Sequence, residues 1–130
     1  IRVGDNVLMK YFIAPVLWAG LIYLGSSMPG SQIPGVSSPL STIAHFVEFA
    51  VLGLLLMPAV LQKRHDKYEA AFWAIFIALS YAITDELHQS WVPGREVDLV
   101  DLLVDLAGAV FGIMVYGWYK RARGLVRSRG

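Results

Sequence analysis

The sequence has no cysteine, and only 16% of its 130 residues are charged. Without cysteine, the chain has neither a disulfide framework nor a thiolate metal site. The low charged fraction, with 56% hydrophobic residues and a mean hydropathy of +0.55, is far from the balance of a soluble domain. We therefore expect a single compact domain, residues 1–130, that is embedded in a membrane.

Long apolar segments recur four times along the chain. They lie at about residues 7–25, 42–61, 70–88 and 98–119, and a basic tail follows at residues 120–130. Each segment has about the 20 residues that a helix needs to cross ~30 Å of hydrocarbon. The pattern predicts an all-α polytopic membrane protein, a bundle of four transmembrane helices.

The basic residues are sorted to one side of such a bundle. They lie before or near the start of the first segment, between the second and third, and after the fourth, and Arg95 is the one exception among the 11 Lys and Arg residues. Cytoplasmic loops of membrane proteins carry this excess of positive charge. We therefore expect a multi-pass protein of the cell membrane with both termini in the cytoplasm. The basic tail suits anionic lipids, and no nucleic acid is expected as a partner because no recognition element accompanies the tail.

Acids and imidazoles fall at matched depths in three of the predicted helices. At ~1.5 Å per residue from the cytoplasmic ends, three acids share a layer roughly 21 to 23 Å deep, namely Glu48, Asp85 and Asp105. One turn further out lie His45, His88 and Asp101. Polar groups at such depth usually face a bundle interior or a water-filled cavity at a functional site. The depths predict an acidic pocket at the extracytoplasmic leaflet.

Within each helix these residues share one face. The pairs spaced by three or four residues are His45 with Glu48, Asp85 with Gln89, and Asp101 with Asp105. Gly108 and Gly112 continue the last of these faces, and two small residues at this spacing let helices approach closely. We therefore expect the fourth helix to run through the centre of the bundle with its acids turned inward.

The polar strings also carry a resemblance to a known family. The strings are His45-Phe-Val-Glu48-Phe with Leu52-Gly53, then Asp85-Glu86-Leu-His88-Gln89-Ser-Trp-Val-Pro93-Gly94-Arg95, then Asp101-Leu-Leu-Val-Asp105-Leu-Ala-Gly108 with Gly112. Through them, over about residues 22–119, the chain resembles the VanZ-like family. The resemblance implies a small polytopic membrane protein of a prokaryotic plasma membrane, in a family whose namesake is associated with resistance to the lipoglycopeptide teicoplanin. Asp105 stands where the family pattern commonly has Asn.

Three kinds of role suit the predicted pocket. The first is an enzyme that hydrolyses or transfers a group on a lipid or lipid-linked cell-envelope precursor. The second is a non-catalytic binder or transporter of an amphiphilic or cationic ligand, such as a lipoglycopeptide, or a proton-coupled carrier. The third is a polar network that only fastens the helices. The predicted catalytic residues are His45, Glu48, Asp85, Glu86, Gln89, Arg95 and Asp101, and the further substrate-binding residues are His88, Asp98 and Asp105.

Two chemistries are open to the enzyme. Glu48, Asp85 and His45 could hold a divalent metal ion that activates water. Without an ion, His45 paired with Glu48 or Asp85 would act as the general base, and Glu86 as the acid. In both versions Arg95 would bind an anionic headgroup.

Overall fold

The computed structural model describes residues 3–29 and 38–127, which contain helices and no strand. The helices are α1 (Val3–Ser26), α2 (Ser38–Leu61), α3 (Lys67–Gln89) and α4 (Leu99–Arg127). Each is long and apolar enough to cross a membrane. The structure thus confirms the predicted all-α fold with four candidate membrane spans.

Every helix is longer than the apolar segment that predicted it. The four helices have 24, 24, 23 and 29 residues in chain order. Hydropathy marks only where charged residues begin, whereas a helix continues as long as its backbone groups find partners. At the start of α3, for example, the Asp66 side chain accepts hydrogen bonds from the backbone N–H groups of Tyr68 and Glu69. This cap starts the helix at Lys67, before the apolar segment begins.

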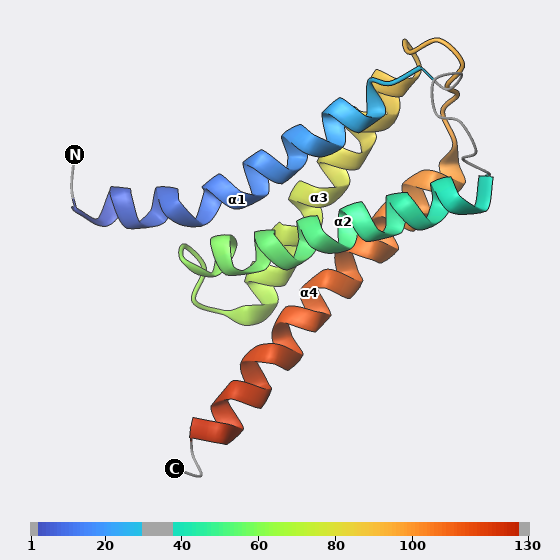
Figure 1. Ribbon diagram of the computed structural model, residues 1–130. Coiled ribbons are helices and arrows are strands. Elements are labelled where there is room, and N and C mark those ends of the chain that lie inside the picture. The colour runs from blue at the N-terminus through green and yellow to red at the C-terminus, as the bar shows by residue number, and fades with distance from the viewer. Residues whose placement is uncertain (1–2, 30–37, 128–130) are drawn as a thin grey trace.

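The helices alternate in direction, so that α1 and α3 end where α2 and α4 begin (Figure 1). We call this end of the bundle, where Ser26, Ser38, Gln89 and Leu99 lie, the polar end. The helices α2 and α4 run parallel and share the most extensive contact in the molecule, and α3 packs against both. Among the described residues, α1 contacts α2 and α3 but not α4. The helices α2 and α3 therefore each contact all three other helices, whereas α4, which the sequence placed at the centre of the bundle, contacts only these two within the described ranges.

Glycines bring the backbones of α2 and α4 together. A Cβ atom on Gly108 would meet the backbone oxygen of Phe46, and one on Gly112 would meet the backbone oxygen of Ala50. Gly53 of α2 contacts the backbone of α4 in the same way. Rotation of a side chain cannot relieve a clash with backbone, so these contacts require glycine. The predicted close approach at Gly108 and Gly112 is confirmed, and the helix that approaches is α2.

A line of alanines packs α3 against this pair. Ala70, Ala74, Ala78 and Ala82 follow one another at intervals of four residues, and all are buried. Residues four apart lie on the same face of a helix, one above the other. The next position on this line is Glu86, which is also buried. The apolar packing face of α3 therefore leads directly to a carboxylate at the polar end.

Large apolar side chains cover the outside of the bundle. Val16 and Leu17 on α1, Phe72 on α3 and Leu103 on α4 are each more than 60% exposed. A water-soluble protein rarely exposes so much contiguous apolar surface. A lipid environment suits this surface, while the buried polar groups face the interior.

We predict that Gly112→Ala destabilises the protein and that Gly117→Ala on the same helix does not. The added methyl group at Gly112 would overlap the backbone of α2, and such overpacking costs about 1–3 kcal/mol. A methyl group at Gly117 would meet no atom of a neighbouring helix within 4 Å, and alanine favours a helix over glycine by ~1 kcal/mol. Thermal unfolding of both variants in detergent, followed by circular dichroism, measures the difference. Equal midpoints would contradict the close α2–α4 contact.

Candidate functional site

His45 occupies the core near the polar end, on α2, with 5% of its surface exposed. Its Nδ1 atom lies 2.9 Å from Oδ1 of Asp105 on α4, and Asp105 is fully buried. Its Nε2 atom lies 3.8 Å from Oδ2 of Asp101, one helical turn earlier on α4. With Asp105 ionised, its carboxylate only accepts hydrogen bonds, and Nδ1 is then the donor. The imidazole is therefore held between two carboxylates of the same helix.

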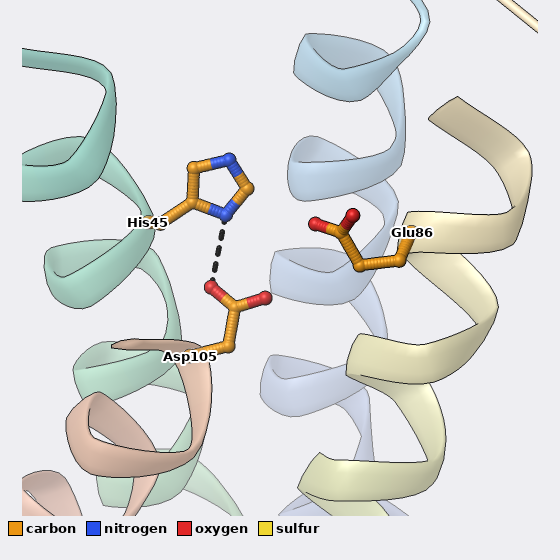
Figure 2. A group of neighbouring side chains, drawn as sticks. All are labelled: His45, Glu86 and Asp105. Carbon is orange, nitrogen blue, oxygen red and sulfur yellow. Dashed lines mark hydrogen bonds and ion pairs between the residues drawn. The ribbon is translucent and has the colours of Figure 1, made fainter. Parts of the chain in front are cut away.

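Glu86, on α3, directs a third carboxylate toward His45 and Asp105 (Figure 2). Its Oε2 atom accepts a hydrogen bond of 3.1 Å from the backbone N–H of Asp98. Its Oε1 atom and Oδ2 of Asp105 are buried and have no hydrogen-bond partner among the described residues. One ligand atom from each of His45, Glu86 and Asp105 lies within 4.8 Å of the others. We call these three residues the buried cluster; their donor atoms are of the kinds that hold a metal ion.

Asp85 forms a separate buried network that ties α1 to α3. Its Oδ2 atom accepts hydrogen bonds from Oγ of Ser26, at 2.8 Å, and from Nε2 of Gln89, at 3.0 Å. Its Oδ1 atom is buried without a partner among the described residues. Neighbouring residues on a helix point ~100° apart at 3.6 residues per turn, so Asp85 and Glu86 face different partners. Asp85 therefore fastens α1, whereas Glu86 faces His45 and Asp105.

The rim of the polar end holds the remaining imidazole and the guanidinium. Nε2 of His88 lies 3.0 Å from Oγ of Ser27, and the His88 ring packs on Tyr23 with 4.4 Å between ring centroids. Nε of Arg95 donates to the backbone oxygen of Met28 at 3.3 Å. These contacts join the chain just after α1 to α3 and to the segment between α3 and α4. Both side chains remain partly accessible there.

Comparison with known families agrees with the motifs. Residues 9–120 match the family described as VanZ/LLP1. The chain belongs to the VanZ/LLP1 family. The resemblance seen in the sequence is therefore confirmed, and the protein is a VanZ/LLP1 membrane protein with four apolar helices. No curated protein and no solved structure matches the chain.

In this VanZ/LLP1 protein, the partners of His45 differ from those that the sequence suggested. Its hydrogen bond goes to Asp105, whereas the sequence pointed to Glu48 or Asp85. Among the described residues, the group placed to hold a metal ion contains Glu86 and Asp105 with His45, in place of Glu48 and Asp85. Glu48 is half-buried and within electrostatic range of His45 and Asp85. Its turn of α2 also faces α1, because its backbone oxygen accepts a hydrogen bond of 2.8 Å from Nε1 of Trp18.

Asp98, a predicted substrate-binding residue, has a structural contact of its own. Its Oδ1 atom accepts a hydrogen bond of 2.8 Å from the backbone N–H of Val100. An aspartate that bonds to the second residue of the following helix is an N-cap. Asp98 therefore starts α4, and its own backbone N–H holds Glu86.

Two features of the site were open to sequence reasoning, and one was not. The spacing of Asp105 from Gly108 and Gly112 indicated an inward position, and the alanine line of α3 ends on Glu86. Both patterns indicate that the side chain is buried, but neither identifies the residue that it contacts. Ser26, which donates a hydrogen bond to Asp85, was not among the predicted site residues. The sequence shows only that Ser26 follows directly after an apolar segment.

We predict that Asp105→Leu destabilises the protein, whereas Asp105→Asn keeps most of its stability. Leucine leaves Nδ1–H of His45 without an acceptor in the core, which costs about 1–3 kcal/mol. The amide oxygen of asparagine can still accept this hydrogen bond. Unfolding midpoints in detergent measure both effects. The double variant His45→Leu/Asp105→Leu should lose less than the sum of the single leucine variants, and strict additivity would argue against the contact.

Proposed function

We propose that this protein is a membrane enzyme that hydrolyses or transfers a group on a lipid or lipid-linked envelope substrate. The buried cluster of His45, Glu86 and Asp105 would carry the chemistry. The observation that supports this most is the pair of buried carboxylate oxygens without partners beside the imidazole, among the residues that the structure describes. Such atoms destabilise the fold, and a site for a substrate or an ion explains why they are there.

A purely structural network fits these contacts less well. In a network that only fastens helices, each buried polar atom gains from having a partner, and unpaired ones cost about 1–3 kcal/mol each. The Asp85 network is closer to that description, because Ser26 and Gln89 both bond to one of its oxygens, although its other oxygen is also buried without a partner among the described residues. In the buried cluster, two carboxylates that each have an unpaired buried oxygen lie next to one imidazole, and the carboxylate of Glu86 points toward His45 and Asp105 (Figure 2).

The surroundings of the cluster favour a lipid as the substrate. The cluster lies between helices whose outer surface is apolar, so an amphiphile in the membrane would lie beside the polar end. Arg95 at the rim carries the charge and the planar fork of donors that bind a phosphate or carboxylate headgroup. Asp101, partly buried beside Nε2 of His45, lies between this rim and the cluster.

The chemistry open to an imidazole between carboxylates is activation of water or of a hydroxyl group. The imidazole can itself accept a proton, or a bound divalent ion can lower the pKa of water. The oxygen so activated would attack the phosphoryl or acyl centre of the lipid, and the bond to the leaving oxygen would break as that oxygen gains a proton. Either route requires His45.

The charges along the chain support an orientation for this reaction. Lys63, Arg64 and Lys67 lie at the opposite end of the bundle from the cluster, as do Lys120, Arg121 and Arg123 on the last turns of α4. The positive-inside rule then places that end and both termini in the cytoplasm of a prokaryotic cell. The polar end would face the envelope side of the plasma membrane. Altered envelope lipids are the route by which the protein would change sensitivity to a lipoglycopeptide such as teicoplanin.

We predict that purified protein in nanodiscs converts one class of envelope lipid, and that His45→Gln and Glu86→Gln abolish this turnover. Loss of a group that moves protons or activates water lowers a rate by about 100-fold or more. Mass spectrometry of an envelope lipid extract before and after incubation measures the turnover.

Glu69→Gln is the matched control, because Glu69 is an exposed acid that pairs with Arg64 at the opposite end of the bundle. It should turn lipid over as the unaltered protein does. If no lipid is converted, but one co-purifies and is lost in His45→Gln, the protein is a lipid binder or carrier and the enzyme proposal is wrong.

A further inference from the structure

We infer that the buried cluster binds one divalent transition-metal ion through His45 Nδ1 and the carboxylates of Asp105 and Glu86. The ion would supply the water-activating chemistry of the proposed enzyme, and for that role the inference rests on the proposed function. The binding itself is argued from the geometry, the charge and the unpaired atoms of the cluster.

The distances in the cluster suit a shared ion. Ligand atoms ~2.1 Å from an ion stand about 3.0 Å apart at right angles and about 4.2 Å apart on opposite sides. Nδ1 of His45 and Oδ1 of Asp105 are 2.9 Å apart, which matches neighbouring ligands. One ligand atom from each of the three residues lies within 4.8 Å of the others, so the side chains would have to close in slightly around a bound ion (Figure 2).

The charge of the cluster calls for a cation. Three carboxylates, those of Glu86, Asp101 and Asp105, surround the single imidazole of His45. Among the described residues, the ion pairs of Asp101 and Asp105 are with His45, and no Lys or Arg forms an ion pair with the cluster. Buried charges in proteins are paired or coordinate metals. A divalent cation would neutralise the excess negative charge at this position.

The unpaired oxygens point to the same place. Oε1 of Glu86 and Oδ2 of Asp105 lack partners among the described residues. Water cannot easily supply them, because Glu86 is only 4% exposed and Asp105 0%. The second oxygen of each carboxylate already has a contact, with Asp98 N–H and with His45. An ion bound between the side chains would give these oxygens the partner that the described residues do not supply.

The groups behind the cluster resemble the outer contacts of metal sites. A metal-binding histidine usually donates its other ring N–H to a carboxylate, and a metal-binding carboxylate is itself hydrogen-bonded. Nε2 of His45 faces Asp101 at 3.8 Å, and Glu86 accepts from the backbone of Asp98. Binding of the ion would displace the proton on Nδ1 and leave the N–H on Nε2, directed at Asp101.

The mixed ligands narrow the choice of ion. Calcium and magnesium are bound by oxygen atoms, whereas an imidazole nitrogen suits zinc, iron and similar ions, and carboxylates also suit manganese. Three protein ligands leave a position for water, as in catalytic zinc sites. We therefore choose Zn²⁺ and Mn²⁺ as probes, with Mg²⁺ for comparison.

We predict that the full chain, purified in detergent and freed of metal with a chelator, binds one Zn²⁺ or Mn²⁺ ion more tightly than Mg²⁺. Isothermal titration calorimetry gives the stoichiometry and affinity. Glu86→Gln should weaken binding by at least ~10-fold, because even loss of an outer contact of a metal site has an effect of this size.

Asp85→Asn is the discriminating control, because Asp85 is an equally buried acid next to Glu86 but lies outside the cluster. It should keep the affinity of the unaltered chain. Circular dichroism of both variants establishes that they fold, and X-ray absorption of the Zn²⁺-loaded chain should show nitrogen and oxygen ligands. Absence of binding by the unaltered chain, or equal losses in Glu86→Gln and Asp85→Asn, would overturn the inference.

Comparison with the lipid assay separates the two proposals. Metal binding that depends on Glu86, without turnover of any lipid, would support the ion site and refute the enzyme. Turnover that is lost in His45→Gln, yet unaffected by a chelator, would support the enzyme and refute the ion site.

Discussion

The close approach of α2 and α4 is the contact on which the rest of the structure depends. Glycines at positions 53, 108 and 112 let the two backbones touch, and any side chain there would push the helices apart. The helices run parallel, so this contact also sets their register along the axis. One consequence of this register is that His45 faces Asp105 at 2.9 Å. A packing feature in the apolar part of the bundle thereby positions the polar residues at its end.

Burying the polar side chains of the cluster lowers the stability of a bundle of this size. An apolar environment penalises each carboxylate and each unpaired oxygen, and lipid around the helices offers them no water. The structure divides its buried acids into two groups with different surroundings. Among the described residues, Asp85, Glu86 and Asp105 each have one bonded and one unpaired oxygen, but Asp85 joins α1 to α3 through Ser26, whereas the other two lie together beside the imidazole of His45. The first group fits a structural role and the second fits a ligand, which is why we place the chemistry at His45.

The sequence predicted the architecture well and the site in outline. Four apolar segments gave the four helices, because the length of an apolar run is set by the thickness of the membrane core. Their ends were less well predicted, since caps such as Asp66 act on backbone groups that hydropathy does not register. The spacing of Asp101, Asp105 and Gly108 correctly indicated an inward face of α4. Depth counting brought Glu48, Asp85 and Asp105 to one layer, but depth does not give the direction in which a side chain points around the helix.

By itself, then, the sequence determined the class of protein, the number of helices and the family, because these follow from local hydropathy and short motifs. The partner of each polar residue was decided only by the tertiary structure. Neighbours such as Asp85 and Glu86 point in different directions, and which helix they meet depends on the crossing of helices far apart in the chain. The pairing of His45 with Asp105 across 60 residues is such a case. This pairing follows from the glycine contact between α2 and α4. No local sequence pattern specifies that α2 is the helix that packs against the glycines of α4.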